Sequence, residues 1–354
     1  MFMKAGFLTK YSLAAASSRY RFHQFQPALE RLGWDVEIES FYPSVYLKRL
    51  YGENRRSVTA IGMGLARRLK LLAKMFQRNY DVVFIQHEML PHLPFAIERQ
   101  FYSRKIPFVV DFDDAVHVRY ENLPFLKTKI PRVISQAAHV IVGNEHLREY
   151  ATRYNDAVSV IPTVIDLRRY ETKASYSADG RDLIIGWIGN PVNTPHLRTL
   201  AGVLRNLSRK LPIRLRCIGT PADFDIDGVC VESLEWATHS ETDILRTFDV
   251  GIMPLVDTPF TRGKCGFKLI QYMGCAVPSV GSAVGANRDI IADGENGYLA
   301  HSEDEWYVKL LALLQDEELR ARIGRAGRRT VEERFSIDHA APKLAAVLRG
   351  AASK

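Results

Sequence analysis

Short apolar runs alternate along the chain with segments whose apolar residues recur at helical spacing. This alternation is typical of parallel sheets, in which crossover helices join strands that are buried on both faces. Two series of strands are predicted. The N-terminal series comprises residues 4–8, 35–39, 81–86, 107–112, 139–142 and 158–161. The C-terminal series comprises residues 183–188, 214–218, 250–254, 277–280 and 298–300.

A polar, turn-rich stretch at residues 162–181 separates the two series. Weak periodicity together with turn residues is typical of a linker between domains. We therefore predict two α/β domains, residues 1–170 and 171–335, followed by a final amphipathic helix that includes residues 340–348.

The most informative stretch is 263–289, which predicts a glycine-bounded loop, a short helix and a buried strand. The apolar residues of the helix recur at helical spacing: Phe267, Ile270 and Met273. Gly266 permits a close backbone approach at the helix start, and Lys264 and Lys268 add positive charge there. A phosphate-bearing ligand is one interpretation. The alternative is an ordinary α/β crossover with solvated lysines.

A second cationic helix start follows the first strand. Ser17 or Ser18 is predicted to cap the helix, and Arg19 and Arg21 then fall in its first turn. Cations at this end oppose the helix dipole by about 0.3–1 kcal/mol. An anionic ligand would relieve this conflict, and so would carboxylates elsewhere in the fold.

Polar groups capable of chemistry follow two strands of the N-terminal series. They are His87 and Glu88 after one strand, and Asp111, Asp113 and Asp114, with His117, around the end of the next. Ligands of parallel sheets bind beyond the carboxyl ends of the strands, so the placement is informative. Clustered acids repel unless they hold a cation, accept hydrogen bonds or share a proton. Metal chelation and helix capping by Asp111 or Asp114 are alternatives.

The C-terminal half opens with a strand that runs into a glycine turn at Gly189 and Asn190. Thr194 and Pro195 then predict the start of a helix that continues to about Leu211. The Gly-x-Gly-x-x-Gly spacing of a dinucleotide fingerprint is missing from this turn, so NAD binding is poorly supported.

Positive charge is concentrated in residues 46–78, where Glu53 is the single acid. The cations of this segment are Lys48, Arg49, Arg55, Arg56, Arg67, Arg68, Lys70, Lys74 and Arg78. Its predicted helix, about 57–76, has an apolar stripe at Ile61, Leu65, Leu69, Leu72 and Phe76. The stripe predicts a core-facing helix, and the basic remainder suits anionic lipid headgroups as an alternative. Nucleic acid is disfavoured, because aromatic stacking residues are not interleaved with the cations.

Composition narrows the class of protein further. The formal net charge of +8 suits an anionic ligand or surface. The four cysteines show no Cys-x-x-Cys pair or histidine ladder, so we expect neither a zinc site nor a disulfide framework. We find no apolar run of transmembrane length and no signal-peptide pattern, so we expect a cytoplasmic protein, or one peripheral at the inner face of the membrane.

Taken together, these motifs resemble the retaining nucleotide-sugar glycosyltransferases of the two-domain GT-B type, family 4 (glycosyltransferase group 1). The matching motifs are residues 17–21, 111–114, 143–145, 161–166, 185–189, 264–269 and 293–298. The resemblance implies two Rossmann-like α/β/α domains facing across a cleft, with an acceptor domain at 1–170 and a donor domain at 171–335. It also implies that the last helix, about 336–354, crosses back to the N-terminal domain.

The resemblance also assigns roles to residues. The implied catalytic residues are Asp113, Asp111, Lys268 and Arg19. The implied donor-binding residues are Lys264, Cys265, Gly266, Phe267, Lys268, Leu269, Gln271, Gly189 and Asn190. Acceptor-side candidates are Glu88, His87 and Asp114. No metal and no other cofactor is expected. The two glutamates usual in the family fall at Gly263 and Gln271, and the Gln271 side chain can still bind a ribose hydroxyl through its carbonyl or its amide.

The implied reaction moves a sugar from a nucleoside-diphosphate sugar to a hydroxyl of a glycan or lipid-linked glycan, with retention of anomeric configuration. The acceptor hydroxyl attacks on the face that the diphosphate leaves, without a protein nucleophile. A non-catalytic GT-B scaffold that binds nucleotide or glycan is one alternative, and a nucleotide-sugar epimerase is another. An anionic membrane surface is a further expected partner of residues 48–78, and nucleic acid is not.

Overall fold

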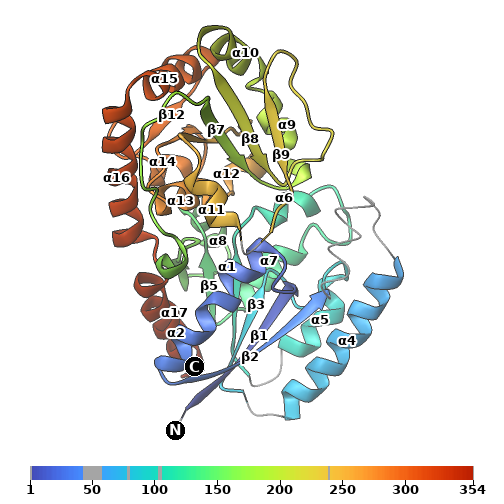
Figure 1. The fold of residues 1–354 in the computed structure, drawn as a ribbon. Coiled ribbons are helices and arrows are strands. Elements are labelled where there is room, and N and C mark those ends of the chain that lie inside the picture. The colour runs from blue at the N-terminus through green and yellow to red at the C-terminus, as the bar shows by residue number, and fades with distance from the viewer. Residues whose placement is uncertain (1, 43–57, 78–79, 103–105, 238–239, 354) are drawn as a thin grey trace. The chain divides into compact units, whose positions relative to one another are not determined.

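The computed structural model describes residues 2–42, 58–77, 80–102, 106–237 and 240–353. They form two compact units (Figure 1). The N-terminal unit contains Met1–Val164, Gly263–Cys265 and Ile337–Lys354. The C-terminal unit contains Ile165–Arg262 and Gly266–Ser336. The chain thus changes unit inside the stretch predicted as a linker.

The N-terminal unit is built on a parallel sheet of order β2-β1-β3-β4-β5-β6. Its strands are β1 Met3–Tyr11, β2 Trp34–Tyr42, β3 Val82–Gln86, β4 Phe108–Phe112, β5 His139–Val142 and β6 Val158–Val160. Its helices are α1 Ala16–Arg21, η1 His23–Phe25, α2 Gln26–Arg31, α4 Val58–Gln77, α5 Phe95–Tyr102, α6 Val116–Tyr120, α7 Lys129–Gln136, α8 Glu145–Ala151 and α17 Ile337–Ala352. Every strand predicted in the N-terminal series is present.

The C-terminal unit is built on a second parallel sheet, of order β12-β11-β10-β7-β8-β9. Its strands are β7 Leu183–Ile188, β8 Ile213–Ile218, β9 Val231–Leu234, β10 Val250–Met253, β11 Ser279–Ser282 and β12 Tyr298–Ala300. Its helices are η2 Leu167–Arg169, η3 Pro191–Asn193, α9 Thr194–Arg198, α10 Ala201–Lys210, α11 Glu241–Arg246, α12 Pro259–Arg262, α13 Phe267–Gly274, α14 Asn287–Ile290, α15 Glu303–Gln315 and α16 Glu317–Arg334. The predicted α/β class with two parallel sheets is confirmed.

Helix α17 returns to the N-terminal unit, as the resemblance implied. It packs beside α2 and contacts β3 and β4 (Figure 1). Its residues Leu344 and Leu348 lie in the same buried cluster as Phe7 and Phe84 of the sheet. The burial of this apolar face holds the end of the chain on the N-terminal core.

Three features of the C-terminal unit differ from the prediction. Strand β9 was missed, because all four of its residues are only half-buried at the edge of the sheet and give no apolar run. The single helix predicted from Thr194 to about Leu211 is divided into α9 and α10. Thr194 was also wrong as the cap, because the N-cap position of α9 is Asn193, whose side chain makes no capping hydrogen bond.

The stripe predicted for α4 is also corrected. Leu69 is 45% exposed, whereas Arg68 is buried and its Nη2 donates to the carbonyl oxygen of Thr9 at 2.5 Å. Several cations of the basic segment lie outside the described residues: Lys48, Arg49, Arg55, Arg56 and Arg78. Membrane contact by this segment stays a prediction. Within the described ranges, no helix combines the length and the apolar character needed to cross a bilayer.

Candidate functional site

A buried ion pair lies at the carboxyl end of β4. The Nε of Arg21 donates to Oδ2 of Asp111 at 3.0 Å, its Nη2 pairs with Oδ1, and its Nη1 donates to the carbonyl oxygen of Ile161 at 2.7 Å. Burial raises the pKa of Asp111, and the positive charge of Arg21 only partly opposes this shift. The sequence left two partners open for Arg21, an anionic ligand and a carboxylate elsewhere in the fold. The structure shows the second of these, the carboxylate of Asp111.

The start of α1 differs from its prediction. Its N-cap position is Ala15, and no side chain caps it. Ser18 instead donates its hydroxyl to the carbonyl of the Gln86 side chain at 2.9 Å. Arg19 and Arg21 lie in the last turn of this short helix, where cations suit the dipole. Arg19 is buried, with its guanidinium 4.7 Å from the ring centroid of Tyr20. The repulsion that we expected between these two arginines and the positive end of the helix dipole therefore does not arise.

His87 and Asp113 form a pair where β3 and β4 end. The Nε2 of His87 lies 2.7 Å from Oδ1 of Asp113, and the imidazole stacks on the ring of Phe112. His87 holds a left-handed backbone with φ of 62°, a conformation that is costly for a non-glycine residue and clusters at functional sites. Burial would raise the pKa of Asp113, but the hydrogen bond and charge of His87 outweigh it and lower that pKa. This pair can accept or orient a proton at the sheet edge where ligands bind.

The loop Gly263–Cys265 packs on the same edge of the N-terminal unit. The thiol of Cys265 donates to the carbonyl oxygen of Asp113 at 3.0 Å, and the side-chain amide of Asn144 donates to the carbonyl oxygens of Gly263 and Lys264 at 2.9 and 3.1 Å. The ammonium of Lys264 lies 4.0 Å from Asp114. Burial raises the pKa of Asp114, and Lys264 opposes this rise. The structure therefore brings Lys264, Cys265, Asp113 and Asp114 together.

Steric contact explains the glycine at position 263. A Cβ at Gly263 would lie 2.6 Å from the Cβ of Ala115 and 2.8 Å from its backbone nitrogen. A side chain cannot occupy that space without moving the backbone between β4 and α6. A glutamate, which the resemblance implied for this position, is thus excluded by the fold of this chain.

Glu88, an acceptor-side candidate, belongs to a buried charge network. Its carboxylate lies 2.7 Å from the ammonium of Lys129 and accepts a hydrogen bond from Tyr120 at 2.6 Å. Lys129 also lies 2.8 Å from Glu98. The ammonium of Lys10 lies 3.9 Å from Glu88 as well. Lys129 and Lys10 together outweigh burial and lower the pKa of Glu88, whereas burial raises the pKa of Glu98 to about 7.

This network predicts a pH dependence of stability. Between pH 4.5 and about 7, folded Glu98 keeps a proton that the unfolded chain has released, so Glu98 makes the free energy of unfolding fall as pH rises. Glu98→Gln is expected to remove this fall, a difference of roughly 1–3 kcal/mol across the window. Urea unfolding at several pH values measures it. The control Glu149→Gln, at an exposed position of the same unit, should behave as the wild type; an unchanged slope in Glu98→Gln would contradict the assignment.

The start of α13 lies in the C-terminal unit. Gly266 is its N-cap with φ of 63°, and a Cβ there would lie 2.2 Å from Cδ1 of Ile290. The next two residues, Phe267 and Lys268, are half-buried, and the Nζ of Lys268 lies 5.5 Å from the ring centroid of Trp187. Gly266 therefore lets the backbone pass close to α14. The helix begins without a side-chain cap, and the cation of its first turn is Lys268.

The other donor-binding candidates of this unit have structural contacts. Leu269 is fully buried. A Cβ at Gly189 would lie 2.3 Å from Cη2 of Trp187, so the glycine makes room for that indole. The side chain of Asn190 accepts a hydrogen bond from Asn193 at 2.9 Å, inside the turn after β7. These contacts place the turn after β7 against Trp187, the residue whose ring also lies near Lys268.

Gln271 is joined to a carboxylate that the sequence analysis did not identify. Its side-chain amide donates to Oε1 of Glu241 at 2.7 Å and to the hydroxyl of Tyr170 at 3.1 Å, and Trp236 donates to the other oxygen of Glu241. Gln271 and Glu241 are both buried. The amide of Gln271 is thus occupied within the unit, and its carbonyl is the group left to accept a ligand hydroxyl. The sequence offered no signal, because Glu241 lies thirty residues before Gln271 in an undistinguished helix.

This contact predicts that a glutamate is not tolerated at position 271. Gln271→Glu places a second carboxylate beside that of Glu241, and we expect the free energy of unfolding at neutral pH to fall by about 1–3 kcal/mol. The double variant Glu241→Gln/Gln271→Glu again pairs one amide with one carboxylate and should regain most of the loss. Urea unfolding of the three proteins measures it, and equal stability of Gln271→Glu and the wild type would refute this explanation.

No metal site is indicated by the described part of the chain, where no three His, Cys, Asp or Glu side chains lie close enough to share an ion. Anions and hydroxyl groups are the ligands that the charged and polar groups described above can bind.

Comparisons with known proteins give consistent results. Residues 182–316 match the family described as glycosyl transferases group 1. The chain is 21% identical over 326 residues to N-acetyl-alpha-D-glucosaminyl L-malate synthase of Bacillus anthracis, covering 86% of this chain and 83% of that protein. Sucrose-phosphate synthase from Thermosynechococcus elongatus superimposes with a TM-score of 0.74 at 15% identity over 98% of both chains. Anabaena HepE in complex with UDP-glucose gives a TM-score of 0.72 at 14% identity, over 98% of this chain and 99% of that one.

Proposed function

The chain belongs to the glycosyltransferase group 1 family and has the GT-B fold, and from this premise we propose that it transfers a sugar from a nucleoside-diphosphate sugar to a hydroxyl acceptor with retention of anomeric configuration. The observation that carries the proposal is the family match of residues 182–316, which includes the start of α13. The bound UDP-glucose of Anabaena HepE makes a uridine donor the first candidate to test.

On the donor side, we assign the diphosphate to the start of α13 and to Lys268, both in the C-terminal unit. Cleavage of the sugar–phosphate bond builds negative charge on the departing diphosphate, and preorganised cations lower the barrier by stabilising that charge. The carbonyl of Gln271 is proposed to accept a ribose hydroxyl, since its amide is occupied by Glu241.

On the acceptor side, we assign the hydroxyl to the His87–Asp113 pair. The left-handed backbone of His87 and its 2.7 Å contact with Asp113 support this assignment, because they fix both groups at the carboxyl edge of the sheet. Asp111, held by Arg21, lies in β4, two residues before Asp113. The acceptor hydroxyl attacks on the face that the diphosphate leaves, and the leaving phosphate takes its proton. The proposed acceptor is a glycan or lipid-linked glycan.

A nucleotide screen tests the proposal. UDP-, GDP-, ADP- and dTDP-sugars are added to the protein, and the thermal midpoint and the release of nucleoside diphosphate are recorded over a panel of hydroxyl acceptors. We expect one donor to raise the midpoint and to be cleaved when a suitable acceptor is present. Binding without release across the panel would favour a non-catalytic scaffold, and a protein that no nucleotide stabilises would refute the proposal.

A further inference from the structure

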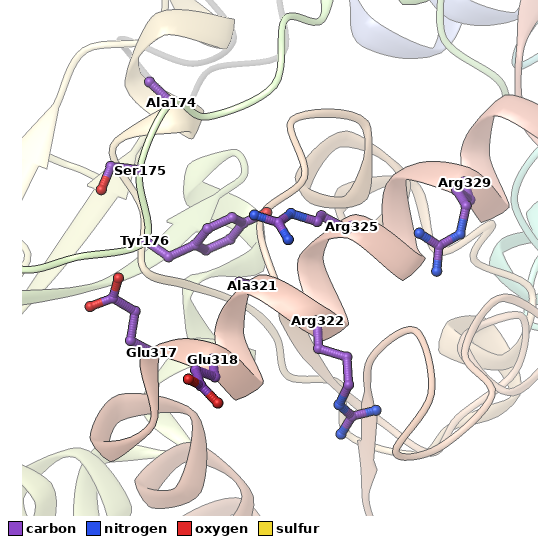
Figure 2. A pocket seen from close by; sticks show the side chains of 9 residues that line it. All are labelled: Ala174, Ser175, Tyr176, Glu317, Glu318, Ala321, Arg322, Arg325 and Arg329. Carbon is purple, nitrogen blue, oxygen red and sulfur yellow. The ribbon is translucent and has the colours of Figure 1, made fainter.

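A recess of about 620 Å³ lies in the C-terminal unit between α16 and the segment before β7 (Figure 2). Three arginines line it: Arg322, Arg325 and Arg329. They are spaced by three and four residues, so they share one face of the helix over about 10 Å. The recess has the size of a small-molecule site, which typically holds roughly 300–1,000 Å³.

Two carboxylates, Glu317 and Glu318, also line the recess, but within the described part of the chain none of the three arginines has a carboxylate within 4.0 Å. The next arginine of the helix shows the contrast, since Nε of Arg328 donates to Glu332 at 2.7 Å. Arg322 donates to the carbonyl oxygen of Gly294 at 3.2 Å. In Figure 2 the carboxylates of the first helical turn lie at the opposite end of the recess from Arg329. Exposed guanidinium groups with this spacing repel one another unless an anion joins them.

Hydrogen bonds hold one wall of the recess, the segment that contains Tyr176. Tyr176 is buried and donates its hydroxyl to the carbonyl oxygen of Ala276 at 2.8 Å. Buried Arg320 donates to the carbonyl oxygen of Tyr176 at 2.7 Å, which ties the segment to α16. The guanidinium of Arg325 lies 5.9 Å from the centroid of the Tyr176 ring, so the ring positions this cation. The Tyr176 side of the recess is therefore held in place, and the three arginines of its other side are exposed.

We propose that this recess binds a phosphate-bearing anion at a site separate from the proposed donor site. Guanidinium groups present paired N–H donors that match the oxygens of a phosphate, and the three cations suit an anion of more than one charge. The same chemistry is offered by a soluble phosphate compound and by a phospholipid headgroup. The inference does not depend on glycosyl transfer, because it rests on the charges and contacts of α16 and Tyr176 alone.

Calorimetric titration with pyrophosphate at constant ionic strength tests the site. The double variant Arg325→Gln/Arg329→Gln is compared with Arg209→Gln/Lys210→Gln, which removes the same charge from exposed positions at the end of α10 in the same unit. All proteins also carry Lys268→Ala, which weakens binding at the proposed donor site equally in each of them. We expect the recess variant to lose at least tenfold in affinity and the control to retain it. Equal affinity of the two variants would overturn the proposal.

A second arm identifies the source of the phosphate. Flotation with phosphatidylcholine vesicles that do or do not contain phosphatidic acid is measured for the same proteins. Binding to the acidic vesicles that the recess variant loses and the control keeps indicates a lipid headgroup. Pyrophosphate binding without such vesicle binding indicates a soluble compound. If the recess variant matches the control in both arms, the arginines are simply solvated and the site does not exist. Thermal unfolding of each variant confirms that it is folded.

Discussion

Lys268→Ala is expected to lower the rate of sugar transfer by about a hundredfold or more. The lysine is proposed to stabilise the negative charge that develops on the leaving diphosphate, and removing one such contact typically costs about 3 kcal/mol in the transition state. Because the charge develops during the reaction, we expect the loss in kcat to exceed the loss in donor affinity. Steady-state release of nucleoside diphosphate and calorimetric titration of the donor separate the two quantities.

Two further variants sharpen this test. Lys210→Ala removes an exposed lysine of α10 and should leave the rate unchanged. Lys268→Arg keeps the charge near Trp187 and should recover part of the rate, although its planar group is placed differently. If Lys268→Ala transfers sugar at the wild-type rate, the diphosphate is held elsewhere and the donor assignment is wrong.

Arg21→Met is expected to lower the free energy of unfolding by about 3–5 kcal/mol. The substitution leaves Asp111 fully buried without the cation that compensates its charge, and an uncompensated buried charge is among the most destabilising changes in a protein. The hydrogen bond to the carbonyl oxygen of Ile161 is lost as well. Urea unfolding of the variant measures the effect.

The pair can be tested as a unit. Arg21→Met/Asp111→Asn removes both charges, and we expect it to be more stable than Arg21→Met, because the remaining amide is much less costly to bury. Arg31→Met, in an exposed turn of α2, is the control and should change stability little. A double variant no more stable than Arg21→Met would show that the ion pair itself is not the source of the loss.

The sequence by itself was sufficient for the fold class and for most strands. Strands buried on both faces, such as β3 and β4, read as continuous apolar runs, and their periodicity needs no partner to be recognised. The same local reasoning located α13 and its glycine start, because helical spacing and backbone freedom are properties of neighbouring residues. It failed at β9, an edge strand whose half-buried residues carry no such run.

The partners of the candidate site residues were decided by the tertiary structure alone. Periodicity cannot tell that Arg21 meets Asp111, that Gln271 gives its amide to Glu241, or that Ala115 leaves no space for a side chain at Gly263. Each contact joins residues at least thirty positions apart, and its energy comes from burial and charge that exist only once the chain is folded. The sequence therefore determined which polar and charged side chains lie at the strand ends, and the fold decided which of these side chains contact one another.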